Sequence, residues 1–347
     1  MSKLTIGYSV LAAFKSCPQK FINDYFLRLQ PKNSGSGAAA LNFGSLIHFG
    51  IEIVGASKLQ SLPSLEACYG EIDYLTSGQP PALDSAGNPL PELQSKHILI
   101  QALHAMAAFA ASQRYALCAF VEDERRSLKH ALLLMTRYVF HHYPESLQYE
   151  TFEQFLTASL GTINGVEVLY EGTVDGTTSD ALVEHKTTSY LNTSFLDRIN
   201  PSDQVTGYLW LLNKNFPDRN IMKTVFDGIS TSGYGKSYGA VTSQPARWTI
   251  NTKPDTLFLR TETWRTQDQL NDWEVRTKDT ISQLIDTIRK YQQGGLITRR
   301  APDACTEFNS TCKFISLCRS TNAADEAQLR AAMYEPAEPW IGFKWTD

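Results

Sequence analysis

The stretch that decides the fold is "EGTVDGTTSDALVEHKTTSY", residues 171–190. Two short apolar runs flank a turn-forming "GTTSD" segment, which is typical of a β-hairpin. Asp175 ends the first run, and the second continues into Glu184, His185 and Lys186. Because side chains alternate along a strand, Glu184 and Lys186 share one side and His185 takes the other. The segment is therefore either a surface hairpin with charged tips or a metal site.

The spacing of the two carboxylates tests the metal interpretation. A hairpin centred on Thr178 would leave Glu184 roughly 10 Å beyond the position opposite Asp175. We therefore expect the strand to bend near Gly172 or Gly176, where a glycine backbone permits it. Two carboxylates and a backbone carbonyl would then supply the oxygen ligands that Mg²⁺ or Mn²⁺ prefers. A lysine beside the ion could orient the attacking water in phosphodiester hydrolysis.

The composition is that of a folded protein without a basic bias. The 347 residues can form one large domain or two smaller ones, and 42% of them are hydrophobic against 20% charged. The formal net charge of −4 provides no overall attraction to nucleic acid, although an enzyme with several metal-binding carboxylates can be acidic overall. The sequence has no apolar stretch of signal-peptide or membrane-spanning length. We expect a soluble, cytoplasmic protein without membrane contact.

Hydrophobic periodicity predicts helices toward both ends of the chain and strands in the centre. Helices are expected at residues 8–29 (two short helices meeting at Cys17), 41–56, 92–143, 203–216 and 267–293. Strands are expected at residues 148–160, 165–176 and 181–188, as an antiparallel meander, and at 221–230 and 256–264. These elements predict one α/β domain over residues 1–347. Within it we expect a helical insertion at 55–145, a cysteine-bearing segment at 296–320 and a polar tail at 321–347.

The cysteines fall into two groups. Cys68 and Cys118 lie in helical segments, where buried small apolar residues are the simplest interpretation. The other four are suited to a metal rather than to disulfides, because a cytosolic chain rarely keeps disulfides. This group comprises Cys17, Cys305, Cys312 and Cys318. Four thiolates would join the two ends of the chain, and their spacing alone does not separate zinc from an iron–sulfur cluster.

The charged hairpin resembles a motif of a known family. "GTVDG" followed by "LVEHKTT" is similar to the PD-(D/E)XK nuclease superfamily, specifically its RecB-like branch. That branch also carries G-x-x-x-H upstream and Q-x-x-x-Y on the next helix, which "GSLIH" and "QVTGY" match here. The resemblance implies a restriction-endonuclease-like core, in which helices flank a mixed central sheet.

The resemblance also implies roles for individual residues. Metal ligands would be His48, Asp175, Glu184 and the main-chain carbonyl of His185. Lys186 would be catalytic, and Gln204 and Tyr208, one helical turn apart, would face the site and position the phosphate or the lysine. Glu150 or Glu153 could add another acidic group from the first strand, and the sequence does not choose between them.

The same branch includes iron–sulfur nucleases, among them AddB-like and CRISPR-associated RecB-like enzymes. These carry one cysteine near the N-terminus and three after the nuclease core, usually as C-x2-C-x5-C. Here the first gap is six residues, which departs from that pattern at Cys305, whereas Cys312 and Cys318 keep the usual spacing. The resemblance therefore favours a four-iron four-sulfur cluster, with zinc as the alternative.

Taken together, the motifs predict a Mg²⁺- or Mn²⁺-dependent deoxyribonuclease. We expect an exonuclease acting on single-stranded DNA or DNA ends in recombination, repair or phage DNA processing, alone or with a helicase or recombination partner. The chain has no G-x-x-x-x-G-K-[ST] loop of its own. Two alternatives stay open: an endonuclease of the same fold, structure-specific or acting on RNA, and a non-catalytic iron–sulfur DNA-binding protein.

Overall fold

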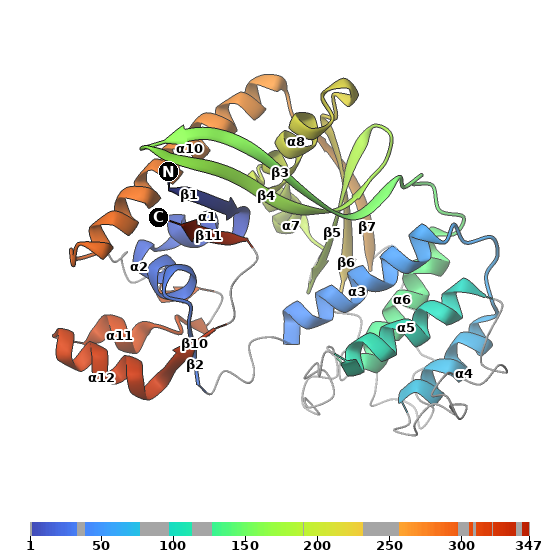
Figure 1. The fold of residues 1–347 in the computed structure, drawn as a ribbon. Coiled ribbons are helices and arrows are strands. Elements are labelled where there is room, and N and C mark those ends of the chain that lie inside the picture. Colours follow the sequence, from blue (N-terminus) through green and yellow to red (C-terminus); the bar gives the residue numbers. More distant parts are fainter. Residues whose placement is uncertain are drawn as a thin grey trace.

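A computed structural model shows a mixed α/β protein (Figure 1). The structure describes residues 2–32, 39–76, 97–112, 127–189, 191–231, 257–297, 305–307, 310–320, 322–337 and 342–346. Cys118 lies outside these residues. In the described part, no helix is both long and apolar enough to cross a membrane.

The centre of the fold is a mixed sheet of seven strands. Its order is β11-β1-β4-β5-β6-β7, and β3 pairs with β4. The strands are β1 Lys3–Gly7, β3 Thr151–Ile163, β4 Val166–Thr177, β5 Ala181–Thr188, β6 Lys223–Ser230, β7 Phe258–Trp264 and β11 Phe343–Thr346. β1 runs parallel to β4 and β5 runs parallel to β6, whereas the other neighbours are antiparallel. The predicted α/β class, with its central mixed sheet flanked by helices, is confirmed.

Helices flank this sheet, and two pairs of short strands lie outside it. The helices are α1 Tyr8–Ser16, α2 Pro18–Phe21, the π-helix η1 Ile22–Phe26, α3 Ala39–Ala56, α4 Leu65–Thr76, α5 Ile98–Ser112, α6 Leu128–His142, α7 Thr193–Ile199, α8 Asp203–Asn215, the 3-10 turn η5 Pro217–Arg219, α10 Gln267–Gln292, α11 Ile315–Arg319 and α12 Ala323–Met333. The short strands β2 Leu29–Pro31 and β10 Tyr334–Pro336 pair with each other, as do β8 Thr306–Glu307 and β9 Ser310–Thr311. The sequence did not predict α7.

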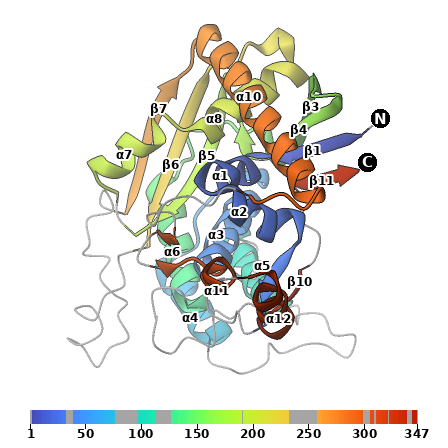
Figure 2. The ribbon, with the colours of Figure 1, turned by 90° about the vertical axis from the view of Figure 1, so that its left-hand side faces the viewer.

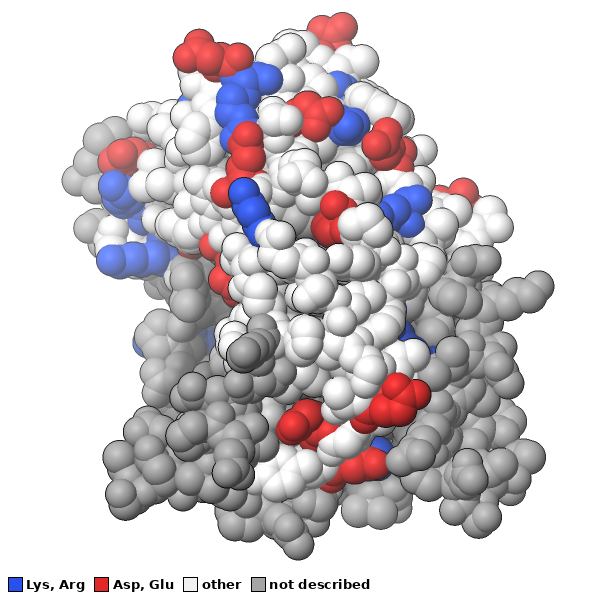
Figure 3. All heavy atoms as spheres, turned by 90° about the vertical axis from the view of Figure 1, so that its right-hand side faces the viewer, with Lys and Arg blue, Asp and Glu red and all other residues white. Residues whose placement is uncertain are grey.

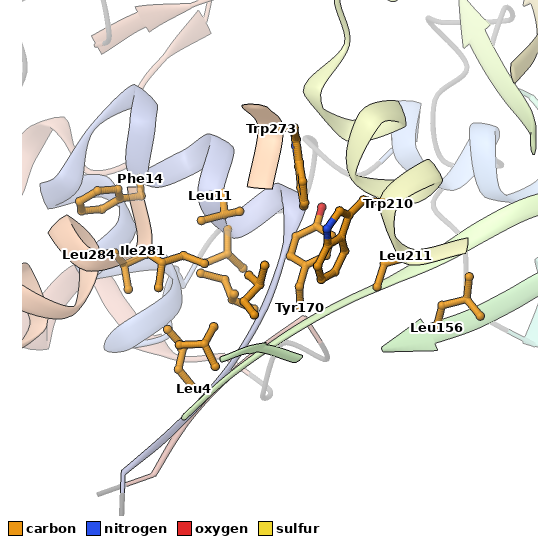
Figure 4. Packing of buried hydrophobic residues seen from close by; sticks show 14 of the residues in the cluster. Leu4, Leu11, Phe14, Leu156, Tyr170, Trp210, Leu211, Trp273, Ile281 and Leu284 are labelled. Atoms are coloured by element: carbon orange, nitrogen blue, oxygen red, sulfur yellow. The ribbon is translucent and has the colours of Figure 1, made fainter. Parts of the chain in front are cut away.

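The larger hydrophobic core lies between the sheet and the helices α1, α8 and α10 (Figure 2). Three aromatic rings at its centre come from β4, α8 and α10: Tyr170, Trp210 and Trp273 (Figure 4). The ring centroids of Tyr170 and Trp273 are 5.0 Å apart, and those of the two tryptophans 5.5 Å. A side chain at Gly207 would come within 2.6 Å of the Tyr170 hydroxyl, so only glycine lets α8 approach this closely. This packing fixes α8 against β4.

A second core holds α3, α4, α5 and α6 together and includes Ile229 and Phe258 at the ends of β6 and β7. The described residues of the expected insertion at 55–145 form α4, α5 and α6 within this core. Ser127 caps α6 by accepting a hydrogen bond from the His130 N–H. The helices that carry the expected insertion therefore pack on α3 and reach the sheet.

The two ends of the chain lie side by side (Figure 1). β1 and β11 form an antiparallel pair in which Ile6 is opposite Phe343 and Leu4 is opposite Trp345. Within the segment expected as a polar tail, 321–347, the described residues form α12, β10 and β11. The alternating Phe343 and Trp345 pack against the main core, which is the ordinary pattern of an edge strand.

Candidate functional site

The β4–β5 hairpin carries both expected carboxylates close to its turn. The Thr178 N–H donates to the Ala181 carbonyl at 2.9 Å, and the Thr178 hydroxyl accepts from the Ala181 N–H at 3.1 Å. The loop therefore consists of residues 179–180, and Thr177 pairs with Leu182. Gly176 pairs with Val183 at the end of this ladder, and Asp175 and Glu184 are the next residue on each strand.

Gly172 and Gly176, where a bend was expected, both lie within the single strand β4. β4 continues from Val166 to Thr177, and neither Gly172 nor Gly176 has a positive φ. Both glycines instead leave space for rings. A Cβ on Gly172 would lie 2.7 Å from the Tyr208 ring, and one on Gly176 would lie 3.1 Å from the Tyr149 ring.

Three candidate ligands from three elements converge beside β4. One ligand atom each from His48, Glu153 and Asp175 lie within 4.8 Å of one another. Nδ1 of His48 is 3.5 Å from Asp175 and 4.0 Å from Glu153. Gly44, one turn before His48, lets α3 lie close to β5, because a Cβ there would be 3.1 Å from the Thr187 hydroxyl. The G-x-x-x-H motif thus combines close helix packing with a ligand.

The structure also distinguishes the two acidic residues that the sequence left open. Glu150 forms an ion pair with Arg219 at 2.6 Å, away from the other ligands. Glu153 falls opposite Asp175 in the β3–β4 register, because Phe152 pairs with Gly176 and Gln154 with Val174. Its φ of 45° is in the left-handed region, which costs a residue other than glycine of order 1–3 kcal/mol. Glu153 is therefore the acid that the fold brings to the site.

Glu184 and Lys186 form the second half of the site. Their side chains share one side of β5, as predicted, and Nζ of Lys186 lies 2.5 Å from Oε1 of Glu184. The Glu184 side chain is 1% exposed, and its other oxygen, Oε2, is buried without a hydrogen-bond partner in the described part of the chain. Burial, together with the nearby Asp175 carboxylate, raises the pKa of Glu184 to about 7.

Helix α8 contributes the two residues predicted from the Q-x-x-x-Y motif. Ser202 caps the helix through the Val205 N–H, which places Gln204 in its first turn. Nζ of Lys186 donates to Oε1 of Gln204 at 3.2 Å, and Nε2 of Gln204 donates to the Tyr208 hydroxyl at 3.0 Å. Lys186 is therefore held between a buried carboxylate and an amide.

Opposite charges counteract the effects of burial in this cluster. Burial alone would raise the pKa of Asp175, but the hydrogen bond and charge of His48 lower it below its usual range. Burial alone would lower the pKa of His48, but Asp175 and Glu153 raise it. Burial would likewise lower the pKa of Lys186, yet the Glu184 carboxylate raises it. Ion pairing between these side chains therefore offsets the cost of burying their charges.

The donor set fits a divalent cation. Most donors are carboxylate oxygens, which suit Mg²⁺ and Mn²⁺, with one imidazole nitrogen from His48. The unpaired Oε2 of buried Glu184 is the kind of atom that a bound cation would satisfy. Among the described residues, the compact set of ligand atoms comprises His48, Glu153 and Asp175 without Glu184. Oε1 of Glu184 is instead paired with Lys186. The chemistry of these donors therefore suits a divalent metal ion.

His185 connects this site to a buried group that the sequence analysis missed. Its main-chain N–H donates to Oδ2 of Asp175 at 2.8 Å, and its imidazole Nδ1 lies 3.2 Å from Oδ2 of Asp227 on β6. Asp227 is 0% exposed and also contacts Arg260 of β7 at 3.3 Å. The sequence signal was an aspartate inside the apolar run "TVFDGIS". A buried strand seldom contains an unpaired acid, so this position indicated a polar network.

The C-terminal cysteine segment contacts the N-terminal part of the chain. Cys17 separates α1 from α2, and the Cys312 N–H donates to the Cys305 carbonyl at 2.7 Å in the β8–β9 hairpin. Lys313 and Asp24 form an ion pair at 2.7 Å between the cysteine segment and η1. The described cysteines form no disulfide. Their thiols are less compact than the His48 set, since the described part contains no second group of three ligand atoms within 4.8 Å.

The surface carries charges of both signs. On the face in Figure 3, Lys and Arg side chains lie among Asp and Glu side chains, and the described residues of that face form no continuous basic patch. This agrees with the formal net charge of −4.

Comparison with known proteins identifies the family. Two solved structures are similar to this chain. SSO0001 is 18% identical, and the match covers 65% of this chain and 82% of SSO0001, with a TM-score of 0.31. A protein from Eubacterium rectale named "Putative exonuclease" is 9% identical, and the match covers 84% of this chain and 99% of that protein, with a TM-score of 0.33. No curated protein matches the chain. Residues 5–319 match the family described as "PD-(D/E)XK nuclease superfamily". The chain belongs to the PD-(D/E)XK nuclease superfamily.

Proposed function

We propose that this nuclease hydrolyses phosphodiester bonds of DNA with the help of Mg²⁺ or Mn²⁺. The observation that carries the proposal is the convergence of His48, Glu153 and Asp175 within 4.8 Å, next to the buried Glu184–Lys186 ion pair. An oxygen-rich ligand set beside a lysine combines cation binding with a fixed positive charge. An ordinary surface hairpin would not bury such a group.

Each residue of the site has a defined role in this proposal. The side chains of His48, Glu153, Asp175 and Glu184 hold the cation, and the His185 carbonyl is a further ligand. When bound, the cation supplies Lewis-acid stabilisation of the phosphate and activates a water molecule. The His185 N–H fixes the orientation of the Asp175 carboxylate through its 2.8 Å hydrogen bond.

Lys186 is the catalytic cation of the protein itself. Its raised pKa keeps it protonated, and the Glu184 carboxylate and the Gln204 amide hold Nζ in place. A protonated amine at this position can hydrogen-bond a phosphate oxygen and stabilise the negative charge that develops during hydrolysis. Tyr208 supports this arrangement by accepting a hydrogen bond from Gln204.

The proposed substrate is single-stranded DNA or a DNA end, attacked exonucleolytically. This role rests on the motif resemblance, and the mixed surface charge supports local rather than extensive contact with the polyanion. Such an enzyme would serve recombination, repair or phage DNA processing, alone or with a helicase or recombination protein.

We propose further that Cys17, Cys305, Cys312 and Cys318 hold a four-iron four-sulfur cluster that joins the ends of the chain. The main-chain hydrogen bond between Cys312 and Cys305 supports the inclusion of Cys305 despite its unusual spacing. The ion pair of Lys313 with Asp24 supports the proximity of the C-terminal segment to the N-terminal helices. All four cysteines are partly buried, where thiolates can be shielded from water.

A substrate panel tests the catalytic proposal. Linear single- and double-stranded DNA labelled at either end, circular single-stranded DNA and RNA are incubated with Mg²⁺, Mn²⁺ or a chelator. We expect metal-dependent release of short products from linear DNA, and no release by Asp175→Asn. Cleavage of the circle would show an endonuclease, and preferred cleavage of RNA would change the substrate. Binding of DNA without cleavage under every metal condition would contradict the enzyme and support a binding protein.

A further inference from the structure

A line of buried polar groups runs across three strands behind the proposed metal site. His185 of β5 is the register partner of Asp227 of β6, which is in turn the partner of Arg260 of β7. Asp227 lies 3.2 Å from the His185 imidazole and 3.3 Å from the Arg260 guanidinium. Residues directly opposite one another on neighbouring strands point to the same face of a sheet, so all three side chains lie on one face.

The far end of this line is anchored in the helical region. Arg260 pairs with both carboxylate oxygens of Glu145, at 2.6 and 2.8 Å. The hydroxyl of Tyr138, from α6, donates to Asp227 and accepts from Arg260 at 3.0 Å. Bidentate arginine–carboxylate pairs fix geometry as well as charge, so this anchor restricts where Asp227 can lie.

The near end of the line reaches the candidate ligands. The His185 main chain donates to Asp175, and its ring centroid lies 5.8 Å from that of His48. His185 therefore contacts the metal-site carboxylate through its backbone and Asp227 through its side chain. Movement of the imidazole would shift the backbone that orients Asp175.

Fold stability alone is a weak explanation for this arrangement. Burying a fully desolvated carboxylate is costly, and apolar residues of similar volume usually stabilise a core as well or better. Metal ligands, by contrast, depend on outer partners that fix their orientation. Asp227 and its partners are such outer groups, because they contact His185, whose main chain orients Asp175.

We propose that Asp227 is a positioning residue of the metal site, acting through His185 on Asp175 and on the His185 carbonyl. This inference rests on the proposed function, because it requires that the site bind a divalent cation. The Arg260, Glu145 and Tyr138 groups keep Asp227 in place and link α6 to the site. The network itself makes no contact with the substrate.

Binding of Mn²⁺ to the otherwise metal-free protein tests the proposal without any substrate. Free Mn²⁺ is measured by electron paramagnetic resonance for wild type, Asp227→Asn, His185→Phe and the double variant. Each single variant should weaken binding about tenfold, and the double variant should be no weaker than His185→Phe alone, since both act through one contact. Hydrogen exchange of the His185 amide should also become faster in Asp227→Asn.

A matched control separates positioning from general destabilisation. Arg265 is 7% exposed and hydrogen-bonds to Thr206 and Thr263, so Arg265→Gln also removes a buried charge from the sheet region. It should lower thermal stability and leave the Mn²⁺ affinity unchanged.

The possible outcomes are distinct. Wild-type affinity in Asp227→Asn, or losses that multiply in the double variant, would overturn the positioning role while leaving the metal site intact. Failure of wild type to bind Mn²⁺ would overturn the proposed metal site and this inference with it. If Asp227→Asn does not fold, His185→Phe decides, and unchanged Mn²⁺ affinity in that variant rejects the proposal.

Discussion

Lys186 and Glu184 form a contact of 2.5 Å between two side chains on the same side of β5. The carboxylate is buried and the ammonium group is partly accessible, with 35% of the lysine side chain exposed. The pair therefore connects the interior of the site to the position where a phosphate could approach. Removing the lysine should affect chemistry more than folding.

Lys186→Ala should lower kcat by about 10²–10³-fold, because it removes a fixed positive charge from the reacting phosphate. The Mn²⁺ affinity should persist, since Lys186 is not a ligand. End-labelled single-stranded DNA and calorimetric Mn²⁺ titration give the two quantities. Lys223→Ala is the control, because Lys223 on the neighbouring strand β6 pairs with Asp180 in the β4–β5 loop. Equal kcat in Lys186→Ala and wild type would contradict the assigned role.

Glu153 on β3 and Glu150, which directly precedes β3, provide a second prediction. Glu153→Gln should weaken Mn²⁺ binding at least about tenfold, because it removes a carboxylate from the compact ligand set. Glu150→Gln should leave binding unchanged, since Glu150 is paired with Arg219. Equilibrium Mn²⁺ titration of both variants checks the assignment. The reverse order of effects would assign the ligand to Glu150.

His142 predicts a loss of stability in acid. Burial and the charge of Arg260 lower its pKa to about 4 from the ordinary value of 6.5. Between pH 6.5 and 4, His142 is therefore protonated in the unfolded chain but stays neutral in the folded protein. The free energy of unfolding falls by up to about 3 kcal/mol over this range. His142→Gln should remove this slope.

The neighbouring His141 serves as the control for that measurement, because its side chain is exposed. Urea unfolding at several pH values should show the same slope in His141→Gln as in wild type. An unchanged slope in His142→Gln would show that other groups cause the acid sensitivity.

Much of the fold follows from local sequence patterns. Strict alternation in "LVEHKTT" correctly placed Glu184 and Lys186 on one side of β5 and His185 on the other. Helical periodicity placed α10 at Gln267–Gln292, close to the predicted 267–293. These features depend on neighbouring residues alone, which a sequence displays directly.

Relations between distant segments were harder to predict. The hairpin register depends on the Thr178 hydroxyl, which bonds to the Ala181 N–H and shortens the loop to two residues. The choice of Glu153 over Glu150 depends on where α3 places His48. The β1–β11 pair joins residues separated by nearly the whole chain, and each strand is too short to give a strong signal.

Gly172 should be intolerant of even a methyl group. A Cβ there would lie 2.7 Å from the Tyr208 ring, so Gly172→Ala should cost about 1–3 kcal/mol in the free energy of unfolding and displace the Gln204–Tyr208 contact. Gly70 on α4 offers a matched control, since no atom lies within 4 Å of its added Cβ. Gly70→Ala should be stabilising by about 0.5–1 kcal/mol, because alanine favours helices. Urea unfolding of both variants measures the difference, and equal effects would contradict the close contact.

The cysteines give a prediction that separates ligands from buried thiols within one chain. Protein purified without oxygen should be brown and contain about four iron and four sulfide per chain if the proposed cluster forms. Cys17→Ser should lose iron and colour, because the cluster would then have three thiolate ligands. In this proposal Cys17 is the ligand that connects the N-terminal part of the chain to the cluster, so Cys17→Ser should also unfold at a lower temperature than wild type.

Cys68→Ser is the control for that change. Cys68 is 0% exposed, and burial raises the pKa of its thiol to about 11, so it resists forming the thiolate that a metal requires. Iron content should therefore stay at the wild-type level in Cys68→Ser, even though a buried hydroxyl lowers stability. If the wild-type protein is colourless and contains one zinc ion, and Cys17→Ser loses that ion, then the four cysteines form a zinc site and not an iron–sulfur cluster. Retention of full iron in Cys17→Ser would instead exclude Cys17 as a ligand, and the contact between the chain ends would then rest on β1, β11 and the Lys313–Asp24 ion pair.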